Sequence, residues 1–245
     1  MRCKLTLSYN GAHFMGSQQQ SSTEPTVTGT LIKALEQLNI SSTPVASGRT
    51  DRGVHATAQV LHVDLPPYWN NLEKLQRALS FQLPSSMHIK KIEAVNNSFH
   101  ARYSAVKRRY RYILSTKKPN PFEADLVTFI PEIDFQRLQD AITLFEGTHN
   151  FEMFKKNGSV NRNFERTIYK TRAYRHKHYL ILTFEANGFL RSQIRMMVYG
   201  LLEIAKGHAT TRQLTEQLAC QKRHFTHLAP HCGLYLSGIK YHSQN

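Results

Sequence analysis

The sequence predicts an α+β fold in which sheets are covered by helices, and three observations lead to this class. Segments that alternate like strands are mixed along the whole chain with segments of helical periodicity. The 245 residues are enough for one large domain or two joined halves with a sizeable core. No apolar run approaches the roughly 20 residues that span a bilayer, so we expect no membrane segment.

The first half of the chain begins with a strand pattern and continues with a helix pattern. Apolar and polar residues alternate over residues 2–9. Between Gly29 and Asn39, the residues Leu31, Leu35 and Leu38 share one face of an amphipathic helix. The other elements expected here are a strand over 57–65, a helix over 71–83 and a strand over 87–95.

The second half repeats this mixture of strands and helices. Asp134 is placed to cap a helix over 135–146, because its carboxylate can accept backbone N–H groups of the first turn. Lys117–Pro121 (KKPNP) is the clearest breaker and a candidate junction between halves. We therefore expect an N-terminal half over 1–104 and a C-terminal half over 105–245 within one continuous fold. The other expected elements are strands over 105–114, 166–175, 178–186 and 234–241 and helices over 189–206 and 211–219.

The charge balance favours a polyanionic partner. Lys and Arg total 32 against 17 Asp and Glu, which gives a net charge of +15. Aromatic residues interleave with this charge in KRRYRYI (107–113) and RTIYKTRAYRHKHY (166–179). Bases stack on aromatic and guanidinium planes, whereas phosphates pair with Lys and Arg. The mixture therefore predicts RNA or single-stranded nucleic acid and not a membrane; the alternative is a solvated basic surface.

Cysteine usage and the N-terminus predict a cytoplasmic protein. The three cysteines, Cys3, Cys220 and Cys232, are an odd number and form no CxxC pair, which agrees with a reducing compartment and no disulfides. The N-terminal segment lacks the apolar core of a secretion signal.

The segment Ser47–Ala56 (SGRTDRGVHA) sets one carboxylate between two guanidinium groups. Asp51 is the only acidic residue from Gln37 to Val63, and Arg49 and Arg52 lie close to it in sequence. Opposite charge at short range favours the ionised carboxylate, so Asp51 is expected to be a nucleophile or a charge partner. The alternative is an Asp that hydrogen-bonds its own backbone in a glycine-bounded turn.

Two further residues stand out on otherwise apolar faces. In the strand 105–114, Tyr110 points with the apolar set, whereas Lys107, Arg109 and Arg111 share the other face, where we expect Arg109 and Arg111 to contact substrate. Tyr110 is then either a core residue or one that stacks on a base. Arg195 lies beside the apolar stripe of the helix expected over 189–206, where it needs a carboxylate or phosphate partner unless it extends to solvent.

Five segments together resemble the TruA-type tRNA pseudouridine synthase family. They follow the family's order over nearly the whole chain: YNGAHFMGSQQQ (9–20), SGRTDRGVHATAQV (47–60), FHARYSAVKRRYRYIL (99–114), NGFLRSQIRMMV (187–198) and GLYLSGIKY (233–241). The resemblance implies two α/β halves with an antiparallel sheet flanked by helices, a central RNA-binding cleft, and a homodimer. It further implies isomerisation of uridine to pseudouridine at tRNA positions 38 to 40, in the anticodon stem-loop, without a cofactor or a metal.

The same resemblance implies roles for single residues. Asp51 resembles the catalytic aspartate, and Tyr110 the tyrosine that packs against the target base. Arg195 resembles the arginine that pairs with the catalytic carboxylate. Arg49 is similar to the loop arginine next to the flipped-out nucleotide, and Leu234 lies in the segment that lines the pocket.

The chain departs from the family pattern at two positions and at its end. Ser17 stands where the family commonly has Trp, and Arg52 stands where it most often has Ala. The sequence also stops soon after Tyr241. These departures bear on substrate range and leave Asp51, Tyr110 and Arg195 intact.

Two alternatives remain open on the sequence alone. His and Cys residues gather in the last part of the chain at spacings that match no standard zinc pattern: Cys220, His224, His227, His231 and Cys232. A metal-dependent nuclease would also be basic. A catalytically weak RNA-binding or chaperone protein of the same fold is the other alternative.

Overall fold

A computed structural model describes residues 1–19, 24–156 and 163–242. The chain divides into two compact units. Unit 1 comprises Met1–Val106 with Tyr235–Asn245, and unit 2 comprises Lys107–Leu234. The division expected after residue 104 lies close to the boundary after Val106. The last strand, which was expected in the second half, belongs from Tyr235 onward to unit 1. Lys117–Pro121 lies inside unit 2, so its assignment as a junction between halves was wrong.

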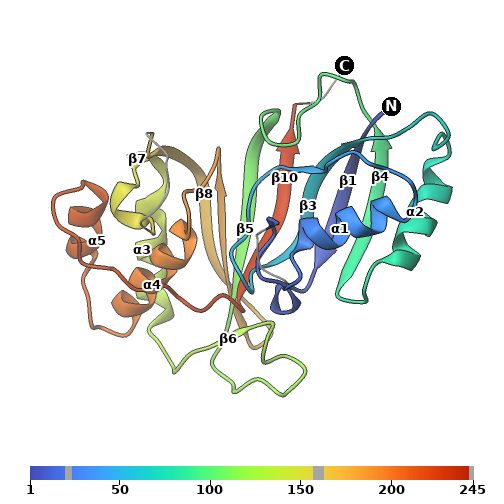
Figure 1. Cartoon of the computed structure of the whole chain (residues 1–245). Coiled ribbons are helices and arrows are strands. Elements are labelled where there is room, and N and C mark those ends of the chain that lie inside the picture. The colour runs from blue at the N-terminus through green and yellow to red at the C-terminus, as the bar shows by residue number, and fades with distance from the viewer. Residues whose placement is uncertain (20–23, 157–162, 243–245) are drawn as a thin grey trace. The chain divides into compact units, whose positions relative to one another are not determined.

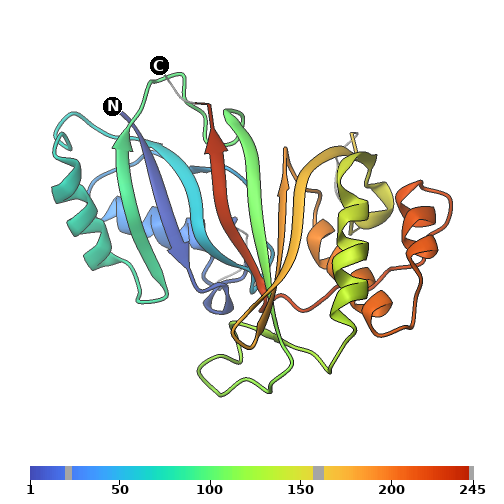
Figure 2. The ribbon, with the colours of Figure 1, turned by 180° about the vertical axis from the view of Figure 1, so that it is seen from behind.

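Unit 1 is a sheet with helices packed on it (Figure 1). Its main strand order is β4-β1-β3-β10, with β1 antiparallel to both neighbours and β10 parallel to β3, and the short β2 also pairs with β3. The helix α1 lies in front of the strands in Figure 1 and behind them in Figure 2. The elements are β1 (Arg2–Tyr9), α1 (Val27–Glu36), β2 (Val45–Ala46), β3 (His55–Asp64), α2 (Leu72–Gln82), β4 (Met87–Ala94) and β10 (Leu234–Tyr241).

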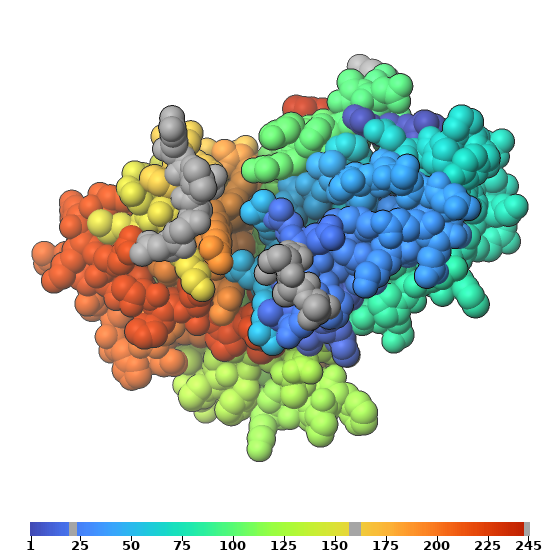
Figure 3. All heavy atoms as spheres, in the orientation of Figure 1, coloured from blue at the N-terminus to red at the C-terminus, as the bar shows by residue number. Residues whose placement is uncertain are grey.

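The core of unit 1 lies between its sheet and its helices. Every second residue of β1 is buried, as the alternating sequence predicts. Leu31 and Leu35 of α1 are fully buried, because they occupy the apolar face of the helix. In the space-filling view of the same face, the side chains of α1 and the segments around it, in blue, cover this part of unit 1 (Figure 3).

Unit 2 carries an antiparallel sheet of order β5-β9-β8-β7, with α3 packed against α4 and β8. The residues of β9 alternate between buried and half-buried, so one face of the sheet forms the core and the other is partly open. The elements are β5 (Ala105–Ser115), β6 (Thr128–Phe129), α3 (Phe135–Ile142), β7 (Gly147–Asn150), β8 (Glu165–His176), β9 (Tyr179–Ala186), α4 (Gln193–Ala205) and α5 (Thr211–Leu218).

These elements confirm the predicted α+β class. Asp134 caps α3 as predicted, since its Oδ1 accepts the N–H of Arg137 at 3.1 Å. The helix expected from residue 189 begins only at Gln193. Ser192 is in the left-handed region at φ 58°, and the Gln193 side chain accepts the Leu190 N–H at 2.7 Å, so the chain turns sharply before the helix. No helix within the described ranges is long and apolar enough to cross a membrane.

Candidate active site

Asp51 lies in a tight turn of unit 1 between β2 and β3. The N–H of Val54 donates to the Asp51 carbonyl at 3.1 Å, and Gly53 has a positive φ of 74° that suits glycine. Asp51 is half-buried, whereas Arg49 and Arg52 are exposed. The turn therefore holds a carboxylate with two cations beside it in sequence, directly before β3.

The flanks of this turn are fixed by buried polar contacts. The Ser47 hydroxyl donates to Gln59 Oε1 at 2.7 Å, and the Gln59 amide donates to the Gly48 carbonyl at 3.0 Å. On the other flank, Gly11 N–H donates to Nδ1 of buried His55 at 3.0 Å, and His55 stacks on Tyr235 with ring centroids 4.6 Å apart. Buried polar groups that are all hydrogen-bonded rigidify their surroundings.

Tyr110 lies in unit 2, on the inward face of β5. Its side chain is buried, and its ring meets Phe189 edge-to-face with centroids 5.3 Å apart and planes at 85°. Such a pair places the ring of Tyr110 in one orientation. Phe189 belongs to the NGFLRSQIRMMV segment, so that this segment contacts the RRYRY strand directly.

Arg195 lies on the first turns of α4 in unit 2 and is half-buried. Its Nε donates to the Ala229 carbonyl at 2.7 Å, and the Ala229 N–H donates back to the Arg195 carbonyl at 3.0 Å. The bond from Nε sets the direction of the guanidinium, and the backbone bond holds the two segments together. Because Nε is used, a carboxylate partner would bind the two terminal nitrogens. Leu234, the first residue of β10, is buried in the same unit.

The basic face of β5 is partly neutralised. Arg109 and Lys107 both bind Glu185 of β9, at 2.7 Å and 3.2 Å. The Arg109 hydrogen bond, with help from Lys107, lowers the pKa of the Glu185 carboxyl below its ordinary value, although partial burial opposes this. Arg111 is exposed one pleat further along. The sequence patterns did not single out Glu185, because only the strand register places it opposite Arg109.

A second pair of arginines lies near the Phe189 segment. Arg108 donates to the Asn187 carbonyl at 2.8 Å, and the Arg166 side chain lies against Gly188. Burial and the charge of Arg108 both lower the pKa of the Arg166 guanidinium. The two guanidinium groups add positive charge to this part of unit 2. In the sequence, Arg108 and Arg166 were marked only by lying in the basic segments.

The Cys and His residues of 220–232 have other partners in unit 2. Across the described ranges, no three His, Cys, Asp or Glu side chains are grouped as metal ligands. Both thiols contact carbonyls and one imidazole contacts a carboxylate: Cys220 with Asn150, Cys232 with Val127, and His224 with Glu216. These contacts give the metal-dependent nuclease no support.

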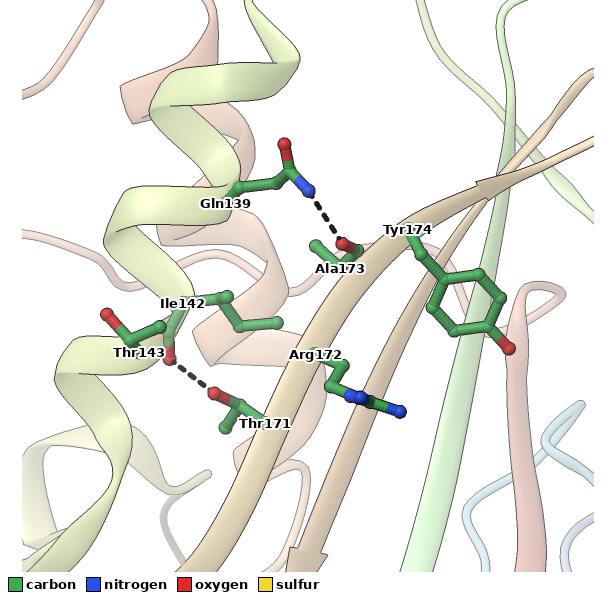
Figure 4. Close-up of a pocket in the computed structure, with 7 residues that line it drawn as sticks. All are labelled: Gln139, Ile142, Thr143, Thr171, Arg172, Ala173 and Tyr174. Atoms are coloured by element: carbon green, nitrogen blue, oxygen red, sulfur yellow. Dashed lines mark hydrogen bonds between the residues drawn. The ribbon is translucent and has the colours of Figure 1, made fainter.

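A pocket in unit 2 lies between α3 and β8, and Figure 4 shows its lining. Gln139 donates to the Ala173 carbonyl at 2.9 Å, and the Thr171 hydroxyl donates to the Ile142 carbonyl at 3.1 Å. These side chains join the helix to the strand. The pocket contains none of the predicted site residues, so it is not the candidate active site.

The predicted site residues are divided between the two units. Unit 1 carries Arg49 and Asp51, and unit 2 carries the others: Arg109, Tyr110, Arg111, Arg195 and Leu234. Within unit 2, Tyr110 and Arg195 are each oriented by a neighbour, Phe189 and Ala229 respectively. Their assignment to catalysis stays a prediction.

Comparison with known proteins agrees with the resemblance seen in the sequence. Residues 6–104 and 141–242 match a family model described as tRNA pseudouridine synthase. The chain is 39% identical over 241 residues to the tRNA pseudouridine synthase A of Campylobacter jejuni (strain RM1221), covering 98% of this chain and 100% of that one. It is 35% identical over 237 residues to the Wolinella succinogenes protein of the same name, covering 97% and 93%. A solved Cbf5-Nop10-Gar1 complex aligns over 82% of this chain and 45% of that chain with a TM-score of 0.38 and 10% identity, a likeness too weak to carry an argument.

Proposed function

Because this chain belongs to the tRNA pseudouridine synthase family, which isomerises uridine to pseudouridine in tRNA, we propose that Asp51 is its catalytic nucleophile. The observation that carries the proposal is the turn of Asp51. It presents a half-buried carboxylate, with Arg49 and Arg52 beside it in sequence, on a backbone held by buried hydrogen bonds. A carboxylate held in this way is suited to nucleophilic attack.

The reaction needs few groups. The bond from C1′ to N1 breaks, a bond from C1′ to C5 forms, the proton leaves C5, and N1 ends with a proton. Atoms and electrons balance within the nucleotide, so no outside electron acceptor takes part. One carboxylate suffices, and it acts either by adding to the base or at the sugar while the glycosidic bond breaks. The residues at hand are compatible with both routes.

The remaining site residues receive supporting roles. The target uridine must leave its stack to be reached, and Arg49, exposed beside the turn, is suited to fill the gap. Tyr110, oriented by Phe189, would hold the base and take part in proton transfer at C5. Arg195 would pair with the catalytic carboxylate through its terminal nitrogens.

We place the target at tRNA positions 38 to 40 in the anticodon stem-loop. Support comes from the family motifs and from the basic residues of unit 2, which include Arg108, Arg166 and the exposed Arg111. Phosphate contacts of this kind fix the position of the RNA and read its shape. We further propose a cytoplasmic homodimer in which two subunits share one tRNA.

The test is to incubate the purified chain, pretreated with a chelator, with unmodified tRNA transcripts and to map pseudouridine at nucleotide resolution. Pseudouridine at positions 38 to 40 supports the proposal. Pseudouridine elsewhere in the tRNA contradicts the placement in the anticodon arm. Binding without any product would favour an RNA chaperone, and cleaved RNA a nuclease.

A further inference from the structure

Thr50, the residue before Asp51, is held at all three of its polar groups. Its N–H donates to Ser17 Oγ at 2.8 Å, and its carbonyl accepts the Ser17 N–H at 3.1 Å. Its hydroxyl contacts the hydroxyl of Tyr9 at 2.9 Å. Thr50, Ser17 and Tyr9 are all buried, at 7%, 3% and 5% exposure. Within unit 1, the backbone that leads into Asp51 is therefore fixed from two directions.

Ser17 is itself anchored to the start of α1. Its carbonyl accepts the Thr28 N–H at 2.9 Å and the Thr28 hydroxyl at 2.6 Å. The carbonyl of Gly16 accepts the Val27 N–H at 3.2 Å. These carbonyls satisfy N–H groups of the first helical turn that have no partner inside the helix. Ser17, which contacts Thr50, is thus itself hydrogen-bonded to the first turn of α1.

Gly16 lets the two segments come this close. It has a positive φ of 94°, and a Cβ there would lie 3.1 Å from the Thr50 carbonyl oxygen and 3.4 Å from the Arg52 N. The Gly16–Ser17 segment therefore packs against the backbone on both sides of Asp51. This close packing brings the Ser17 hydroxyl within hydrogen-bond distance of the Thr50 N–H.

We propose that Ser17 is a positioning residue, which fixes the Thr50 backbone so that the Asp51 carboxylate is held where the reaction needs it. This inference rests on the proposed role of Asp51. A displacement of about 1 Å in a reacting group can cost roughly a hundredfold in rate. Serine at position 17, where the family commonly has Trp, then supplies a hydroxyl that an indole could not replace, because the indole nitrogen donates and does not accept.

Ser17→Ala removes the acceptor and leaves the Thr50 N–H buried without it. We expect the single-turnover rate at saturating tRNA to fall about tenfold to a hundredfold, whereas the dissociation constant of tRNA changes less than about twofold. If Ser17 served stability alone, its loss would not lower the single-turnover rate of the folded enzyme while leaving the dissociation constant of tRNA unchanged. Ser17→Thr keeps the oxygen and is expected to recover most of the rate.

Ser115→Ala is the matched control. Ser115 is a buried serine in unit 2 whose hydroxyl accepts the Lys117 N–H at 3.2 Å and donates to the Lys117 carbonyl at 2.7 Å. This variant loses a comparable hydrogen bond in the unit that does not carry Asp51. We expect it to lower the melting temperature about as much as Ser17→Ala and to leave the rate of the folded enzyme unchanged.

Tyr9→Phe tests the same idea from the other side of Thr50. Burial raises the pKa of Tyr9 to about 12, so its hydroxyl stays protonated in any assay near neutral pH. We expect a reduced rate with an unshifted pH profile in Tyr9→Phe and in Ser17→Ala. The double variant is expected to lose less than the product of the two single losses, because both contacts act on one residue.

The inference is overturned if Ser17→Ala turns over within twofold of wild type, or if it loses rate only in proportion to Ser115→Ala. A pH profile that shifts in Ser17→Ala would also overturn it, since positioning does not change ionisation. Asp51→Asn, assayed in parallel, keeps the two proposals apart. If Asp51→Asn is active, the proposed nucleophile fails; if it is inactive while Ser17→Ala is unimpaired, only the inference on Ser17 fails.

Discussion

At the scale of single residues, Tyr110 combines a ring fixed by Phe189 with a hydroxyl that the proposed chemistry uses. Tyr110→Phe keeps the ring, so we expect tRNA binding to change little. The chemical step should slow by about a hundredfold or more if the hydroxyl takes part in proton transfer. Single-turnover rates and filter-binding constants measured on the same preparations separate the two effects. The exposed Tyr174 on β8 offers a control, Tyr174→Phe; a Tyr110→Phe rate equal to this control would leave Tyr110 as a core residue.

Arg195 is predicted to need the planar guanidinium and not the charge alone. Its Nε binds the Ala229 carbonyl, and a carboxylate would bind the terminal nitrogens; a lysine ammonium cannot serve both geometries. We expect Arg195→Lys to lose about 1.5 to 3 kcal/mol of transition-state stabilisation, or roughly tenfold to a hundredfold in rate. Arg212→Lys, at an exposed position of α5, is the control and should retain the wild-type rate. Equal rates in the two variants would argue against the proposed pairing.

The site residues divide into those that local pattern reveals and those that it does not. Asp51 stood out as an isolated acid among arginines, and Tyr110 and Arg195 as polar groups on apolar faces. Ser17 was visible only as a departure from the family pattern. Its hydroxyl accepts the backbone N–H of Thr50, a group that nearly every residue has, and the two residues are 33 apart in sequence, so nothing in a local window indicates the contact.

At the scale of elements, periodicity predicted the long strands and helices well. It missed β7, because Gly147–Asn150 is short and mostly exposed and has no alternation to detect. It also began the fourth helix too early, since apolar spacing continues through Phe189 and Leu190 although Ser192 turns the backbone away from a helix. Periodicity reports which face is buried, whereas the ends of elements depend on local backbone contacts.

The pairing of β5 with β9 should depend on pH through Glu185. The pKa of this carboxyl is lowered in the folded protein, chiefly by Arg109. Its stabilising effect is therefore complete above the pKa of the unfolded chain and is lost as the pH falls through the lower folded value. We expect Glu185→Gln to cost about 1 kcal/mol of unfolding free energy at pH 7, and the difference from wild type to shrink toward pH 3.

Urea unfolding at several pH values measures this effect. Glu152→Gln, at an exposed glutamate of the same unit, is the control and should show little difference at any pH. A Glu185→Gln deficit that stays constant down to pH 3 would show that the side chain acts through packing and not through its charge.

At the scale of the whole molecule, the net charge of +15 predicts a strong dependence of tRNA binding on salt. Each phosphate that is neutralised should contribute a slope of about −0.7 to −0.9 in a plot of log affinity against log salt. We expect Arg166→Ala to reduce the magnitude of the slope by about one phosphate, because Arg166 lies on β8 in the basic segment 166–179 that is predicted to contact the RNA. Arg212→Ala, on α5, should keep the wild-type slope.

Titration of tRNA at several salt concentrations, with the solution mass of the protein measured in parallel, tests both the charge and the proposed dimer. A flat salt dependence would contradict the electrostatic account of binding. A particle with the mass of one chain would contradict the homodimer. Neither result would bear on the chemistry of Asp51, which is a separate claim.

The most direct test of that chemistry compares wild type with Asp51→Asn on unmodified tRNA, with pseudouridine mapped at each nucleotide. The amide keeps the shape of the side chain but removes the nucleophile. We predict pseudouridine at positions 38 to 40 with wild type and less than about 1% of that rate with Asp51→Asn, a loss of more than roughly 2.7 kcal/mol, while tRNA binding is retained. Pseudouridine formed by Asp51→Asn at a rate near that of wild type would contradict the account.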